Sequence, residues 1–181
     1  MNTLTQYQAQ QARCRELFAK KTQDYGTAWR ILRLSSLTDQ LWIKAKRIRS
    51  IEEKGEQKIA DSVENEYIAL VNYSLIALIQ LELGEKTSET AGLELGMETA
   101  LNLYTQAAQS TEKLMLDKNH DYGEAWREMR ISSLTDLILM KLLRVKQIEE
   151  LNGQTQISEG VDANYQDIIN YSLFALIRLQ K

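Results

Sequence analysis

Two Lys-x-x-Arg pairs are the residues of this chain best suited to bind an anion. They are Lys44 with Arg47, and Lys141 with Arg144. In the helix expected over residues 37–54, Lys44 points into the middle of an apolar face and Arg47 lies at its edge. A cation on an apolar face is costly unless it is paired or directed at a ligand, so an anion site and an internal ion pair both stay open. An aspartate lies beyond the face in each case, at Asp39 and Asp136.

A second candidate is the motif Asp-Tyr-Gly-x-Ala-Trp-Arg, which occurs twice. Its members are Asp24, Tyr25, Gly26, Trp29 and Arg30, and then Asp121, Tyr122, Gly123, Trp126 and Arg127. The glycine fits a left-handed helix end, and the aspartate could cap the short helix that follows. The tryptophan is either a core anchor or a stacking face for a nucleobase beside the arginine.

The dipeptide Asn-Tyr also occurs twice, as Asn72-Tyr73 and Asn170-Tyr171. Each lies in an expected helix that is apolar around most of its circumference, so these side chains must find hydrogen-bond partners. They either fix the register of a bundle or contact a bound base or ribose.

Acidic residues could hold Mg²⁺, because hard cations take oxygen ligands. The candidate ligands are Glu159, Asp162 and Asp167. Asp61, Glu64 and Glu66 occupy similar turns earlier in the chain, but Ala69 stands where Asp167 does. The helix dipole also favours acids in a first turn, so a structural role stays open. If the chain catalyses a reaction, its second half is the better candidate.

These motifs recur because the chain contains an internal duplication. Residues 24–53 match residues 121–150 at 17 of 30 positions, and residues 59–81 match 157–179 at 11 of 23. A residue kept in both halves met the same demand twice. We therefore divide the chain into a first helical repeat (1–83), a linker (84–96) and a second helical repeat (97–181).

The elements that position the motifs are expected to be helices. The chain has no proline and long runs of good helix formers. The main expected helices are 6–22, 37–54, 98–119, 134–152 and 159–181, and one more that starts at Asp61 or Ser62 and runs to about Leu83. Asp61 with Glu64 has the form of a capping box. The predicted fold class is all-α, a bundle of two tandem three-helix repeats related by a pseudo-twofold axis, with the halves paired.

Composition excludes several classes of function. The net charge is −3, so no nucleic-acid partner is indicated. A single cysteine, no apolar signal core and no membrane-length apolar stretch predict a soluble, cytoplasmic protein. The only histidine, His120, faces Gln23 in the other half, which argues against a histidine base or zinc site. A homo-oligomer is left open.

The pattern Lys-x-x-Asp-Tyr-Gly-x-Ala-Trp, then Lys-x-x-Arg, then an acid-led helix ending in Asn-Tyr resembles the nucleotide modification associated domain 1 family. This family of phages and bacteria has long been labelled a domain of unknown function. The resemblance covers residues 21–81 and 118–179, so the chain looks like a two-copy bacterial form. It implies a nucleotide-related role for the motif residues above.

Some positions depart from the pattern of the phage members. These often have an aspartate before the Lys-x-x-Arg lysine, where this chain has Ile43 and Met140, and only Asp167 survives of the later acids. The losses weaken the case for a metal-dependent activity, most of all in the first half. The layout is also loosely similar to the MazG-like all-α nucleotide pyrophosphatases, but their Glu-Glu-x-x-Glu signature is missing.

The sequence therefore predicts a nucleotide-binding protein of the nucleotide-modification type, with a Mg²⁺-dependent pyrophosphatase-like activity as its finer form. The lysines and arginines would face phosphate, and the tryptophans and tyrosines the base. The alternatives are a non-catalytic helical scaffold and a partner-binding adaptor.

Overall fold

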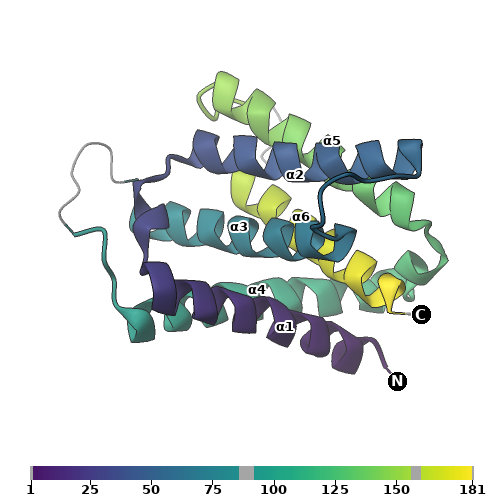
Figure 1. Cartoon of the computed structure of the whole chain (residues 1–181), viewed down its shortest axis with the longest axis horizontal. Helices are drawn as coiled ribbons and strands as arrows, with labels where there is room; N and C mark the ends of the chain where they lie inside the picture. Colours follow the sequence, from purple (N-terminus) through teal and green to yellow (C-terminus); the bar gives the residue numbers. More distant parts are fainter. Residues whose placement is uncertain (1, 86–91, 156–159, 181) are drawn as a thin grey trace.

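Helices account for most of the residues described by the computed structural model, which are 2–85, 92–155 and 160–180 (Figure 1). The α-helices in this part of the chain are α1 Thr3–Tyr25, α2 Leu34–Lys54, α3 Val63–Leu83, α4 Met97–Tyr122, α5 Ile131–Glu150 and α6 Val161–Leu179. Two short 3₁₀ helices, η1 Ala28–Ile31 and η2 Ala125–Glu128, join α1 to α2 and α4 to α5. The predicted all-α class is confirmed.

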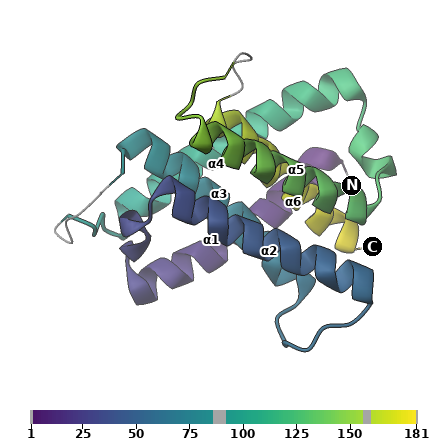
Figure 2. The same cartoon turned by 90° about the horizontal axis from the view of Figure 1, so that it is seen from above.

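The helices form three layers, each with one helix from either half (Figures 1 and 2). α3 and α6 make the middle layer, α2 and α5 cover one side of it, and α1 and α4 run antiparallel on the other. The two halves therefore share one hydrophobic core. Neither half could bury the apolar surface of its third helix alone. The predicted pairing of the two halves is confirmed by the contact between α3 and α6.

α3 is the most apolar of these helices because it is buried on nearly every side. Among the described residues it alone is long and apolar enough to cross a membrane by length and composition, but most of it lies inside the bundle. A core helix of this kind needs no lipid to cover it.

The helix ends differ from the predictions at several places, and α1, for example, extends three residues further than expected at each end. Of the two expected starts, Ser62 and not Asp61 caps α3, and its hydroxyl accepts a hydrogen bond from the Asn65 N–H at 3.2 Å. α2 and α5 each begin three residues earlier than expected, directly after the 3₁₀ turn. Asp24 and Asp121 cap nothing, since Thr27 and Glu124 precede the 3₁₀ helices without a side-chain cap. The glycine prediction is confirmed at Gly123, which ends α4 in the left-handed helical conformation with φ 59° and ψ 43°. Gly26 ends α1 with a positive φ of 62° but a ψ of −146°, which is not the left-handed helical conformation.

Each buried asparagine of the Asn-Tyr dipeptides pairs with a tyrosine of the opposite half. The Tyr104 hydroxyl donates to Asn72 Oδ1 at 2.7 Å, and the Tyr7 hydroxyl donates to Asn170 Oδ1 at 2.8 Å. The Asn72 amide also donates to the Cys14 carbonyl at 3.1 Å. These bonds tie the middle layer to α1 and α4, which fits the register role, one of the two roles left open for the asparagines. Asn72 also lines the cavity described below.

A second symmetric contact joins the halves between α2 and α5. The Thr38 hydroxyl donates to Glu149 at 2.7 Å, and the Thr135 hydroxyl donates to Glu52 at 2.8 Å. Partial burial raises the pKa of both carboxyl groups, and this effect outweighs the threonine bond, which lowers it.

Replacing both glutamates in the variant Glu52→Gln/Glu149→Gln is expected to stabilise the protein at pH 7. A folded-state pKa above the unfolded value of 4.5 means that stability falls as pH rises through that window. Glutamine removes this penalty and still accepts the threonine bond. Because both groups are partly exposed, the gain should be about a few tenths of a kcal/mol. Urea unfolding from pH 4 to 8 should show the gain shrinking toward pH 4.5; a gain constant with pH would contradict the explanation.

Candidate functional site

A cavity of about 470 Å³ opens in the first half, between the end of α1, η1, the middle of α2 and the start of α3. We call it the first-half cavity. Its wall combines aromatic side chains with charged ones, and the members used below are Phe18, Lys21, Tyr25, Trp29, Lys44, Asp61, Glu66, Ala69, Tyr73 and Ile76. Sequence reasoning missed Lys21, Phe18 and Ile76. Lys21 recurs as Lys118, three residues before the Asp-Tyr-Gly motif of each half, and that repetition is a signal that could have found it.

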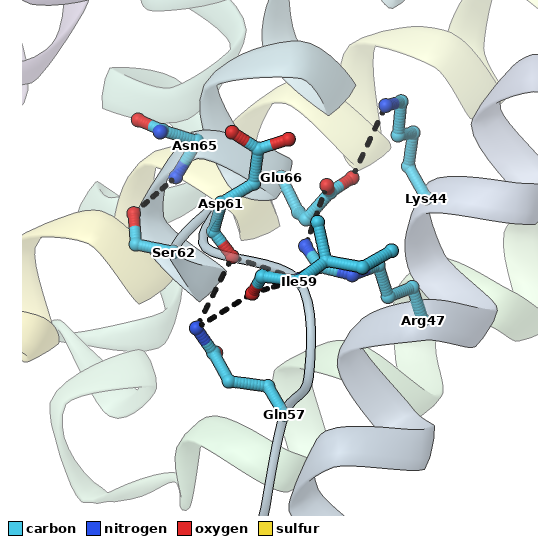
Figure 3. Close-up of polar contacts among 8 residues, drawn as sticks. All are labelled: Lys44, Arg47, Gln57, Ile59, Asp61, Ser62, Asn65 and Glu66. Carbon is cyan, nitrogen blue, oxygen red and sulfur yellow. Dashed lines mark hydrogen bonds and ion pairs between the residues drawn. The ribbon is translucent and has the colours of Figure 1, made fainter.

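Glu66 is the buried charge of the first-half cavity (Figure 3). It is 4% exposed, and its Oε1 accepts a hydrogen bond from Arg47 at 2.7 Å. Its Oε2 lies 3.5 Å from the Lys44 ammonium and has no hydrogen-bond partner among the described residues. Lys44 thus faces a carboxylate of a neighbouring helix, and it lines the cavity as well.

Arg47 does not line the cavity. Besides Glu66, its guanidinium donates to the Asp61 carbonyl at 2.8 Å and approaches the Ile59 carbonyl at 3.4 Å (Figure 3). It therefore holds the segment between α2 and α3 in place. Asp61, at the rim of the cavity, is positioned by this contact.

Aromatic rings form the other side of the cavity. The Trp29 and Phe18 ring centroids lie 6.4 Å apart at an angle of 47°, and Trp29 is half-buried. Tyr25 is 76% exposed at the rim. Phe18, Tyr25 and Trp29 thus give this side of the cavity an aromatic lining.

Arg30 does not lie beside that ring face. It is 3% exposed and donates to Gln80 Oε1 and to the Gly84 carbonyl. The Gln80 amide in turn donates to the carbonyls of Trp29, Arg30 and Leu32. This cluster fastens η1 to α3 and so fixes where Trp29 stands.

The second half arranges the same motif differently. Asp167 Oδ1 accepts from Lys118 at 2.6 Å, and its Oδ2 lies 2.9 Å from Lys141. Trp126 is buried between the parallel ring of Phe174, with centroids 4.3 Å apart, and the Arg127 guanidinium, 4.4 Å from the Trp126 ring. No ring face of Trp126 is open to a ligand.

The remaining candidates lie away from the cavity. Asp39 lies 3.8 Å from Lys146 and Asp136 lies 3.5 Å from Arg49, as exposed ion pairs between the halves. Asp24, Asp121 and Tyr122 are exposed, and Arg144 is half-buried on α5. The structure therefore brings together Tyr25, Trp29, Lys44 and Asn72 of the predicted set.

The predicted magnesium ligands do not form a cluster in the described residues. Asp162 is exposed, Asp167 is taken by two lysines, and Glu159 lies outside the described residues. No group of three or more His, Cys, Asp or Glu side chains in ranges 2–85, 92–155 and 160–180 is placed to hold a metal. Cys14 is buried, and burial raises the pKa of its thiol to about 12, which disfavours the thiolate.

Fold and site together define a duplicated all-α bundle with a charged, aromatic-lined cavity in its first half. The model of the nucleotide modification associated domain 1 family matches residues 21–81 and 118–179, and the chain belongs to this family with one copy in each half. The predicted two-copy resemblance is confirmed. No curated protein and no solved structure gives a significant match to the chain.

Proposed function

We propose that this protein binds a nucleotide in the first-half cavity, as part of a nucleotide-modification process. The observation that carries the proposal is that two lysines and an aromatic wall line one cavity of about 470 Å³. That volume lies within the roughly 300–1,000 Å³ of small-molecule sites. The family's name points to the same class of ligand.

Each part of a nucleotide has a matching group in the wall. Trp29 offers a stacking face for the base, an interaction of about 1–3 kcal/mol in single-strand binders. Lys21 and Lys44 are point charges suited to phosphate. Glu66 Oε2, buried without a hydrogen-bond donor, would accept one from a sugar hydroxyl or a base N–H.

The proposal is limited to binding. A Mg²⁺-dependent hydrolysis would need more oxygen ligands than Asp61 and Glu66, and the described residues assemble no such set. The scaffold alternative is favoured by the Lys44–Glu66 pair, which would serve the bundle without a ligand. Binding measurements separate the two.

Calorimetric titration with nucleoside mono-, di- and triphosphates, with and without Mg²⁺, is expected to show saturable binding. Trp29→Ala should weaken it about tenfold through lost stacking. Lys21→Met should weaken the binding of phosphorylated ligands but not that of the free nucleoside. Because Lys21 is exposed, this variant is expected to keep the fold. Trp42→Ala, which removes a tryptophan of α2 outside the cavity, is the matched control. Well-folded protein that binds none of these ligands would refute the proposal in favour of the scaffold.

A further inference from the structure

Three positions that line the first-half cavity carry different residues at the corresponding positions of the second half. With an offset of 98 residues, Glu66 corresponds to Asn164, Ala69 to Asp167, and Ile76 to Phe174. The first half thus carries its carboxylate one helical turn earlier than the second. Both halves keep one buried carboxylate, but its position relative to the lysines is changed.

In the second half, that carboxylate lies between two lysines. Asp167 takes Lys118 at 2.6 Å and Lys141 at 2.9 Å, and these are the counterparts of Lys21 and Lys44. In the first half, Ala69 brings no carboxylate to the equivalent place, and Lys21, Lys44 and Ala69 all line the cavity. An anionic group of carboxylate size therefore has a place between the two lysines over Ala69.

The aromatic end shows the same contrast. Phe174 lies on Trp126 with ring centroids 4.3 Å apart and planes 4° from parallel. Its counterpart Ile76 has no ring, and both Ile76 and Trp29 line the cavity. A flat ring from a ligand could take the place beside Trp29 that Phe174 takes beside Trp126.

We infer that the second half is a self-filled copy of the ligand site, in which Phe174 stands for the base and Asp167 for the phosphate. These residues are seven positions apart on α6, or about 10 Å along the helix, which the base and the phosphate of one nucleotide can span. The charged side chains that line the cavity are Lys21, Lys44, Asp61 and Glu66, and their formal charges cancel, which disfavours the larger charge of further phosphates. The ligand is therefore a nucleoside monophosphate, bound once per chain in the first half. This inference rests on the proposed function.

A reciprocal exchange between the halves tests the inference. The closing variant Glu66→Asn/Ala69→Asp/Ile76→Phe gives the first half the residues of the second. The opening variant Asn164→Glu/Asp167→Ala/Phe174→Ile does the reverse. Both keep the net charge at −3, since each removes one carboxylate and adds one.

Calorimetry with nucleoside monophosphates gives the stoichiometry and affinity, and thermal unfolding checks the fold. The wild type should bind one equivalent, more tightly than the matching triphosphate, and the closing variant should lose about tenfold or more in affinity. The opening variant should bind two equivalents. A folded closing variant with wild-type affinity, or a wild type binding two equivalents, would overturn the inference even if the opening variant does not fold. A wild type that binds no nucleotide refutes the proposed function itself.

Discussion

Replacing Asp167 with alanine is expected to lower the free energy of unfolding by about 3–5 kcal/mol. Asp167 is 8% exposed and its partner Lys141 is 9% exposed, so the variant leaves a buried ammonium without a counter-charge. Lys118 suffers less, because nearly half of its side chain already reaches water. Urea unfolding monitored by circular dichroism measures the loss.

Two comparisons show whether burial is the cause. Asp136→Ala removes an exposed carboxylate that lies 3.5 Å from Arg49, and it should cost about 1 kcal/mol or less. Glu66→Ala should fall between the two, because Lys44 and Arg47 are both partly exposed and can turn to water. If Asp167→Ala cost no more than Asp136→Ala, Lys141 would have to be solvated in the folded protein.

Helix periodicity and the lack of proline were enough to predict the elements of this fold. The pairing of the helices was harder to predict, because the sequence does not indicate which helix packs against which. Asn72 illustrates this: it was expected to need a hydrogen-bond partner, and only the structure shows that this partner is Tyr104 of the other half. Hydrogen bonds between layers depend on the packing of the whole bundle.

The duplication predicted the site only in part. Identical motif residues were expected to play identical roles, but Trp29 lines a cavity and Trp126 is buried under Phe174. The roles diverge because the third helix supplies different neighbours, and those neighbours lie outside the motif. Glu66 was named as a helix-start acid, and only the structure shows it meeting Lys44 and Arg47.

Arg30 and Arg127 show the same divergence through one neighbour. Gln80 accepts a hydrogen bond from Arg30. The counterpart of Gln80 in the second half is Arg178, whose side chain has no acceptor atom and donates to the Arg127 carbonyl instead. Like charges repel, and Arg127 instead reaches the start of α1, where its guanidinium donates to Thr3 and Gln6 at 2.7 Å each. It also donates to Glu124 at 2.9 Å. Arg30 is buried, and Arg127 lies nearer the surface.

The two arginines are therefore expected to differ sharply when each is replaced by alanine. Arg30→Ala should lower the free energy of unfolding by about 2–4 kcal/mol, because it leaves a cavity and removes the donor of hydrogen bonds to Gln80 Oε1 and the Gly84 carbonyl. Arg127→Ala should cost less, about 1 kcal/mol, because the Arg127 side chain is partly exposed and water can replace it at Glu124, Thr3 and Gln6. Urea unfolding of both variants under one condition gives the comparison.

A double variant identifies the source of the difference. If Gln80 is the reason why Arg30 is buried, the double variant Arg30→Ala/Gln80→Leu should lose less free energy of unfolding than the two single variants together, because the two residues share one contact. Nucleotide affinity should also fall in Arg30→Ala, because Gln80 and Arg30 fix η1 and with it Trp29. Equal losses for the two arginines would mean that Gln80 and Arg178 do not decide their burial, and that the motif residues are held alike in both halves.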